Sequence, residues 1–185
     1  MPHTRLDLFK NPEYNPGAAW PKRIFWFYVN ACIFKTSLLP SSSFKTFLLR
    51  VFGARVGKGV VIKPCVNIKY PWKLRIGDHC WIGEEVWIDN LDEVTLHNHV
   101  CISQGAFLLC GNHNYKKTGF DLVTAPITLE SGAWAGAKTV ICPGVIMHTE
   151  SVLTAGSVAT KSLDAFGIYG GNPAVKLRDR LIEEA

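Results

Sequence analysis

Apolar residues recur, mostly at intervals of six, through the middle of this 185-residue chain. The recurring positions are Val56, Ile62, Ile68, Ile76, Ile82, Ile88, Leu96, Ile102, Leu108, Leu129, Ala135, Ile141, Met147, Leu153 and Ala159. An interval of six fits neither the 3.6-residue turn of a helix nor the alternation of a single strand. It fits a short strand followed by a turn, and three such units make one triangular coil. A fixed repeat of this kind is typical of solenoids, in which each coil buries its apolar face against a neighbour.

The repeat has two forms and one interruption. The first nine positions fall into three blocks twenty residues apart, which begin at Arg55, Arg75 and Thr95. Each of these coils therefore carries two extra residues, whereas the spacing from Leu129 onward is a strict six. Between them the rhythm stops, and residues 110–126 are polar and rich in turn-forming residues. We expect this segment to project from the solenoid as a loop, because such residues favour turns over packed strands.

Three regions follow from this pattern. Residues 1–53 lack the repeat and are predicted to form a partly helical N-terminal extension. Residues 54–164 are predicted to form the coils, and residues 165–185 a C-terminal tail. Asn172 followed by Pro173 is typical of a helix start, because asparagine caps the free N–H groups and proline suits the first helical position. We therefore expect a helix to close the solenoid.

Composition limits the class of protein. Apolar residues make up 48% of the chain and charged residues 19%, which indicates a globular fold. The six cysteines form no CxxC pair, so we interpret them as small core residues in a reducing compartment and expect no metal. The first twenty residues lack the apolar run of a signal peptide, so a cytoplasmic location is expected.

Positive charge is concentrated in the N-terminal half. No acidic residue lies between Tyr14 and Gly77, a stretch that holds eleven lysines and arginines. Such asymmetry suggests an anionic partner, although solvated coil edges would give the same pattern. Within residues 20–52 an aromatic run with basic flanks is too short for a membrane span and resembles an interfacial helix. Contact with a membrane surface and packing on the solenoid or a neighbouring subunit are both open. We expect no nucleic-acid partner.

Several short motifs resemble a known superfamily. Trp134-Ala135-Gly136, residues 143–146, residues 155–158 with Thr160-Lys161, and residues 171–174 resemble the C-terminal repeats of hexapeptide-repeat acyltransferases. Residues 49–57 and 70–74 more specifically resemble the WcaF-type colanic acid biosynthesis acetyltransferases. The likeness covers residues 45–181 and implies a left-handed parallel β-helix. It also implies a homotrimer with active sites between subunits, and acetyl-CoA as the donor.

Acetyl transfer to a sugar hydroxyl needs a base, because the hydroxyl is a poor nucleophile until its proton is removed. Histidine suits this role near neutral pH, since its unperturbed pKa is about 6.5. Of the six histidines, His113 alone lies in the segment that interrupts the repeat. Functional residues concentrate on loops held by a rigid scaffold. The resemblance also implies a catalytic histidine at this point, so His113 is the predicted catalytic base.

Acceptor and donor contacts are predicted at other positions of the coils. Asp89 and Asn90 lie one coil before the interruption, where the resemblance implies a substrate-contacting asparagine, and Gln104 is a further candidate for the acceptor pocket. The resemblance also places Trp134 near the acetyl end of the donor. Small or basic residues complete the predicted acetyl-CoA site, namely Ala137, Ala155, Thr160, Lys161 and Arg178. Small side chains let the backbone approach the donor, and cations balance its phosphates.

Three functional alternatives remain. The leading hypothesis is an O-acetyltransferase that acts by direct transfer on a sugar of an exopolysaccharide or of its lipid-linked precursor. A related enzyme acting on a small molecule, such as an antibiotic, would use the same coils and base. A zinc-containing β-helix of the carbonic anhydrase type would need three converging histidines, for which only His97, His99 and His113 are available. His97 and His99 lie too close along one turn for that arrangement.

Overall fold

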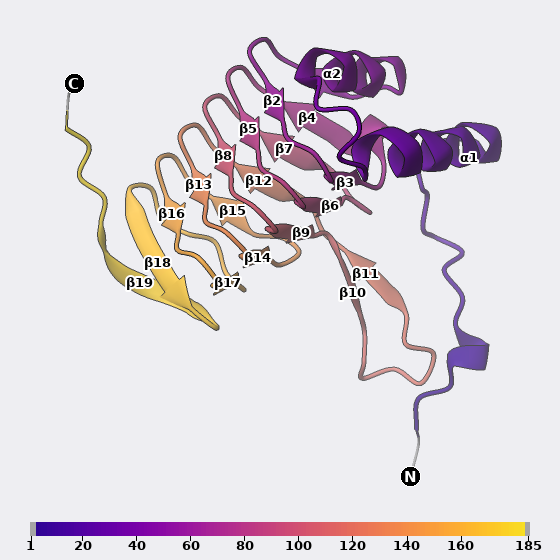
Figure 1. The fold of residues 1–185 in the computed structure, drawn as a ribbon. Helices are drawn as coiled ribbons and strands as arrows, with labels where there is room; N and C mark the ends of the chain where they lie inside the picture. The colour runs from indigo at the N-terminus through magenta and orange to yellow at the C-terminus, as the bar shows by residue number, and fades with distance from the viewer. Residues whose placement is uncertain (1–2, 184–185) are drawn as a thin grey trace.

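The computed structural model describes residues 3–183 as a parallel β-solenoid with helices α1 and α2 at its N-terminal end (Figure 1). Three sheets form its faces. The first sheet contains β1 (Arg55–Val56), β4 (Leu74–Ile76), β7 (Val94–Leu96), β12 (Ile127–Leu129) and β15 (Ile146–Met147). The second contains β2 (Val61–Ile62), β5 (Trp81–Ile82), β8 (Cys101–Ile102), β13 (Trp134–Ala135), β16 (Val152–Leu153), β18 (Gly167–Gly171) and β19 (Ala174–Asp179). The third contains β3 (Asn67–Ile68), β6 (Trp87–Asp89), β9 (Phe107–Leu109), β14 (Val140–Ile141) and β17 (Val158–Ala159).

The six-residue repeat places one aliphatic side chain from each strand inside the solenoid. In the second sheet the equivalent positions are Ile62, Ile82, Ile102, Ala135 and Leu153. Each of these side chains is at most 1% exposed. Burial of apolar surface stabilises a fold by roughly 25 cal/mol per Å², so these stacked columns supply the main driving force for coil formation. The predicted parallel β-helix is confirmed.

The twenty-residue spacing of the early coils appears directly in the strand register. Arg55 pairs with Arg75, and Arg75 pairs with Thr95. The extra residues lie just before β4 and β7, at the corner between the third and first sheets. Before β4 they form a short 3-10 turn, η3 (Pro71–Lys73).

A buried asparagine holds the first of these enlarged corners. The Asn90 side chain has no exposed surface. Its Oδ1 accepts a hydrogen bond from the Tyr70 N–H at 2.9 Å, and its Nδ2 donates to the carbonyls of Tyr70 at 2.6 Å and Lys73 at 3.2 Å. The wider corner would otherwise leave the backbone groups of Tyr70 and Lys73 without hydrogen-bond partners. The Asn90 amide supplies these partners, which buried polar groups require.

Helix α1 (Trp20–Val29) and the π-helical turn η2 (Asn30–Phe34) cover the first coil beside the third sheet. The Trp26 ring is buried, and its Nε1–H donates to the carbonyl of Ile68 at 2.9 Å. This bond satisfies an acceptor on β3, the terminal strand of the third sheet. The extension is therefore partly helical, as predicted.

Helix α2 (Ser42–Val51) covers the terminal strand of the second sheet, β2, as α1 covers that of the third sheet. The Ser42 hydroxyl accepts from the N–H of Ile62 on the terminal strand β2 at 3.0 Å. Lys45 is fully buried, its Nζ donates to the carbonyl of Lys63 at 2.8 Å, and burial lowers its pKa. The two helices thus replace the hydrogen bonds that a preceding coil would have made, which protects an otherwise open sheet edge.

The predicted C-terminal helix is wrong. Residues 167–179 instead form the strands β18 and β19, with Asn172 and Pro173 at the turn between them. The strand β18 pairs in parallel with β16, where Val152 lies opposite Ile168, and β19 folds back antiparallel. Parallel pairing of Ile168 and Tyr169 with β16, together with the antiparallel pairing of β18 with β19, outweighs the local capping signal.

We predict that Asn90→Ala destabilises the fold by about 3 kcal/mol, because it leaves buried backbone groups of Tyr70 and Lys73 without partners. The free energy of unfolding in urea measures this loss. Asn98→Ala is a matched control: this asparagine is exposed, and its Oδ1 accepts one bond, from the Asp78 N–H. The control should cost less than about 1 kcal/mol, and equal losses would contradict the proposed role of Asn90.

Candidate functional site

The interruption of the repeat is a β-hairpin. Its strands are β10 (Gly111–His113) and β11 (Leu122–Thr124), which pair antiparallel with His113 opposite Leu122. The hairpin leaves the solenoid after β9 and projects away from the stacked coils (Figure 1). It therefore presents its residues beside the solenoid rather than within the core.

The imidazole of His113 is held in one orientation by the backbone of its own hairpin. Its Nδ1 lies 2.8 Å from the carbonyl oxygen of Phe120. A carbonyl oxygen can only accept a hydrogen bond, so Nδ1 carries the proton in this arrangement. In the neutral ring Nε2 then keeps its lone pair, which is the form that a general base requires.

Two aromatic rings flank this imidazole. The Phe120 ring stacks on it with centroids 4.3 Å apart and an interplanar angle of 8°. The Phe9 ring lies 5.6 Å away at 53°, directly after a short 3-10 turn, η1 (Leu6–Leu8). We call Phe9, His113 and Phe120 the aromatic clamp, because together they restrict the movement of the histidine ring.

Phe9 belongs to an N-terminal strap, residues 5–15, that binds along the hairpin. The Arg5 N–H donates to the carbonyl of Thr118 at 2.8 Å. The Asn11 Oδ1 accepts from the N–H of Leu122 at 3.2 Å. Segments more than a hundred residues apart in sequence therefore hold the hairpin together.

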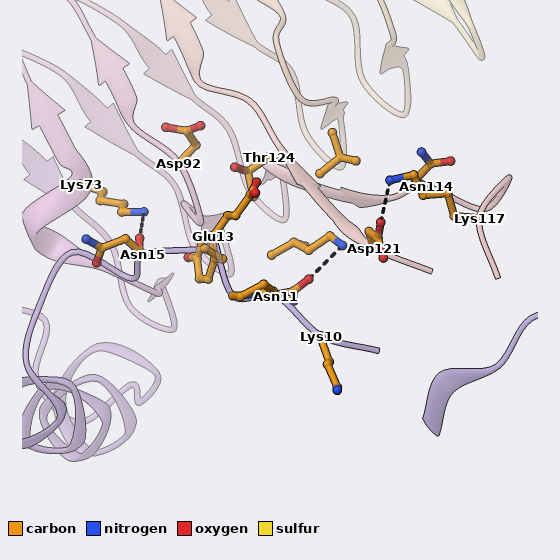
Figure 2. Close-up of a pocket in the computed structure, with 14 residues that line it drawn as sticks. Lys10, Asn11, Glu13, Asn15, Lys73, Asp92, Asn114, Lys117, Asp121 and Thr124 are labelled. Atoms are coloured by element: carbon orange, nitrogen blue, oxygen red, sulfur yellow. Dashed lines mark hydrogen bonds and ion pairs between the residues drawn. The ribbon is translucent and has the colours of Figure 1, made fainter. Parts of the chain in front are cut away.

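A cavity of about 650 Å³ lies between the strap and the hairpin (Figure 2). Much of its lining is polar or charged, including Lys10, Glu13, Lys73, Asp92, Asn114, Lys117 and Asp121. Lys73 reaches it from η3 and donates to the Asn15 carbonyl at 2.9 Å, and burial lowers its pKa. Carboxylate, amide and ammonium groups in one cavity suit a ligand rich in hydroxyl groups.

The predicted acceptor residues Asp89 and Asn90 lie at the foot of the hairpin. The N–H of Cys110, at the start of the hairpin, donates to the Asp89 carbonyl at 3.3 Å. The Asp89 side chain is 10% exposed and pairs with Lys69 Nζ at 2.9 Å. The Asn90 amide is buried and already occupied by backbone groups, which leaves it no surface for a ligand.

The third predicted acceptor residue, Gln104, lies elsewhere. It sits at the corner between the second and third sheets, stacked in one column with Ala137 and Ala155. Backbone bonds connect this column, from the Lys138 N–H to the Gln104 carbonyl and from the Gly156 N–H to the Ala137 carbonyl. The hairpin lies between β9 and β12, at the corner between the third and first sheets. Because this is a different corner, one chain does not bring the column to His113.

The remaining predicted donor residues follow the later coils. Trp134 is 45% exposed on the outer face of β13, and its Nε1–H donates to the Ser103 hydroxyl at 2.9 Å. Thr160, Lys161 and Arg178 are exposed, the first two after β17 and the last on β19. Arg178 is therefore a strand residue and not part of a terminal helix.

The other turn histidines do not converge. His79 and His99 are exposed and stack on each other with centroids 5.3 Å apart, and His97 is exposed beside them. Within residues 3–183, no three His, Cys, Asp or Glu side chains are placed to hold a metal ion.

Sequence reasoning missed the partners of His113. Phe9 lies in a segment without the repeat, and Phe120 acts through both its ring and its carbonyl. No spacing or motif connects residues 9 and 113, since their contact arises only when the strap folds back on the hairpin.

A comparison with models of known protein families found no match. The chain is 40% identical over 179 residues to WcaF of Escherichia coli strain K12. WcaF carries a provisional name, colanic acid biosynthesis acetyltransferase. That match covers 97% of this chain and 98% of WcaF. Galactoside O-acetyltransferase of the same strain is 29% identical over 136 residues, which is 71% of this chain and 66% of that protein.

Solved structures share the fold. A hexapeptide-repeat acetyltransferase of Vibrio cholerae O1 biovar eltor, in complex with acetyl-CoA, superposes with a TM-score of 0.80 at 21% identity, covering 95% of this chain and 97% of the other. A galactoside acetyltransferase in complex with coenzyme A gives 0.75 at 25% identity, covering 86% and 80%. Because the similarity to WcaF extends over nearly the full length of both proteins, this chain belongs to the WcaF-type acetyltransferases of the hexapeptide-repeat superfamily.

Proposed function

We propose that this protein is a cytoplasmic O-acetyltransferase that moves the acetyl group of acetyl-CoA to a sugar hydroxyl in exopolysaccharide biosynthesis. Relatives support both substrates, since one is named for colanic acid biosynthesis and others were solved with acetyl-CoA or coenzyme A. The observation that carries the proposal is the orientation of His113, whose Nδ1 is occupied by the Phe120 carbonyl and whose Nε2 is left for chemistry.

His113 acts as the general base in the proposed reaction. Nε2 takes the proton of the acceptor hydroxyl while its oxygen attacks the carbonyl carbon of the thioester. The tetrahedral intermediate collapses, the carbon–sulfur bond breaks, and the imidazolium returns the proton to the departing thiolate of coenzyme A. The acetyl group passes directly to the sugar, so the enzyme forms no covalent intermediate.

The aromatic clamp positions this base. In the orientation in which Nδ1–H donates to the Phe120 carbonyl, the imidazole also stacks on the Phe120 ring, at an interplanar angle of 8°. The Phe9 ring packs against the imidazole at a centroid distance of 5.6 Å, which limits rotation of the imidazole. Reactions of this type are sensitive to small displacements of the catalytic group.

We propose a homotrimer with active sites between subunits. The hairpin with His113 and the column of Gln104, Ala137 and Ala155 lie at different corners of one chain. A neighbouring copy can bring its column to the hairpin of the first. Acetyl-CoA would then lie along the later coils, with Trp134 near the acetyl group and the cations Lys161 and Arg178, with Thr160, near the phosphates.

The acceptor site is proposed at the foot of the hairpin. The Asp89 carboxylate is 10% exposed and paired with Lys69, and it would accept hydrogen bonds from sugar hydroxyls there. Asn90 supports this corner from below through its bonds to the backbone. The polar cavity under the strap adds further hydrogen-bonding groups beside the hairpin.

Replacing the base should remove turnover but not donor binding. We expect His113→Ala to lower kcat by about 10²–10⁴-fold, measured as transfer of labelled acetyl from acetyl-CoA to a panel of sugar acceptors. The affinity for coenzyme A, measured by calorimetry, should stay within about twofold, which is about 0.4 kcal/mol. His97→Ala is the control, because this histidine is exposed at a turn. Undiminished turnover by His113→Ala would refute the assignment.

Loosening the clamp should slow the reaction without weakening substrate binding. We expect Phe9→Ala to lower kcat about tenfold, with KM for acetyl-CoA unchanged, because the imidazole loses one of its two supports. Phe9→Tyr should restore most of the rate. Leu6→Ala removes a strap side chain that is 66% exposed and should have no effect. A rise in KM alone would instead place Phe9 in the binding of substrate.

A further inference from the structure

The helical end of the molecule, residues 20–52, exposes many large apolar side chains; we call it the helical cap. On α1 they include Trp20 (68% exposed), Phe25 (65%), Phe27 (64%) and Tyr28 (61%), and on α2 Phe47 (56%) and Val51 (60%). Leu38, in the connection between the helices, is 82% exposed. Monomeric proteins rarely expose apolar side chains in such a cluster unless another surface covers them.

Basic side chains outnumber acidic ones around the cap. The cap carries Lys22, Arg23, Lys35 and Arg50 near its surface, and no acidic residue lies between Tyr14 and Gly77. Aromatic side chains mixed with lysine and arginine are typical of helices that lie in the interface of a membrane. Clustered cations also attract the negative surface of an anionic bilayer.

A cleft of about 400 Å³ opens beneath α1 and combines the same two chemistries. Trp20 and Phe27 line it from the helix and Trp87 from the third sheet, while Arg23, Lys35 and Lys69 supply cations. Asp89 also lines the cleft, and its carboxylate pairs with Lys69 at 2.9 Å. Among the described residues, Arg23 and Lys35 are then the cleft cations without an ion pair. Such a cleft suits the phosphate of a lipid headgroup and the first methylene groups of its chain.

The position of the cap allows this contact without blocking the rest of the molecule. Helices α1 and α2 lie at one end of the solenoid, whereas β18 and β19 lie at the other, and the hairpin projects sideways (Figure 1). No helix within residues 3–183 is long and apolar enough to cross a bilayer. A protein that meets a membrane through this cap would rest on its surface.

We propose that the helical cap docks on the surface of an anionic phospholipid bilayer, with a lipid phosphate in the cleft beneath α1. The exposed aromatic side chains enter the headgroup region, and the cations of the cap meet anionic lipids. None of the cap residues belongs to the aromatic clamp. Asp89, which we place in the acceptor site, also lines the cleft beneath α1, so the two proposals share this one residue.

Flotation of the full-length protein with vesicles tests this surface. Vesicles of phosphatidylcholine and phosphatidylglycerol should carry the protein to the top of a density gradient, with binding about tenfold tighter than to phosphatidylcholine alone and weaker in high salt. Absence of binding to anionic vesicles would overturn the proposal, and so would equal binding to neutral ones. Free inorganic phosphate should not release the protein at concentrations near those of the lipid headgroups.

Matched variants separate the cap from other exposed surface. Trp20→Ser with Phe27→Ser, and Arg23→Glu with Lys35→Glu, should each weaken vesicle binding at least about tenfold. Val175→Ser with Leu177→Ser removes two exposed apolar side chains from β19, at the far end, and should bind like the unmodified protein. Circular dichroism establishes that each variant is folded.

Two results would assign the cap differently. If the control pair loses binding as strongly as the cap variants, the interaction is not specific to the cap. If the cap variants change the sedimentation velocity of the protein without vesicles, the cap is an interface with a second copy. His113→Ala leaves the cap unchanged and should bind vesicles like the unmodified protein, so failure of either proposal is visible without the other.

Discussion

Hydrogen bonding between successive coils is the interaction on which the rest of the structure depends. Each inner strand, such as β5 between β2 and β8, is paired on both sides, and the aliphatic columns are buried only because the coils stack in register. The two terminal coils lack one neighbour. Side chains of α1 and α2 supply the missing bonds at one end, and β18 and β19 do so at the other. Both appendages therefore complete the solenoid.

A rigid solenoid can hold a functional hairpin only if the hairpin is itself restrained. Two residues from different parts of the chain hold the histidine: Phe120, through its carbonyl and its ring, and Phe9, through its ring. The strap secures Phe9 through backbone bonds at Arg5 and Asn11. The N-terminal extension consequently has two roles. Its strap restrains the hairpin that carries His113, and its helices α1 and α2 cover the edges of the sheets.

The repeat made most of the fold predictable, because an apolar side chain every six residues can be buried only by coils of that length. That His113 lies on a segment outside the stacked coils was predictable for the related reason that the repeat stops there. The C-terminal strands were not, since Asn172 and Pro173 carry a local helix signal that pairing with β16 overrides. The structural roles of Asn90 and Phe9 were also not predictable from the sequence. Asn90 bonds to the backbone of Tyr70, and Phe9 packs against His113, and no spacing in the sequence indicates either contact.

The central claim is that His113 and the donor-binding coils meet between two copies of this chain. A crystal structure of the protein with coenzyme A bound tests it most directly. We predict a trimer in which the thiol sulfur lies about 3–4 Å from Nε2 of His113, within reach of proton transfer, while the pantetheine arm follows the column of Ala137 and Ala155 of the adjacent subunit. A thiol bound far from every His113 would contradict the account.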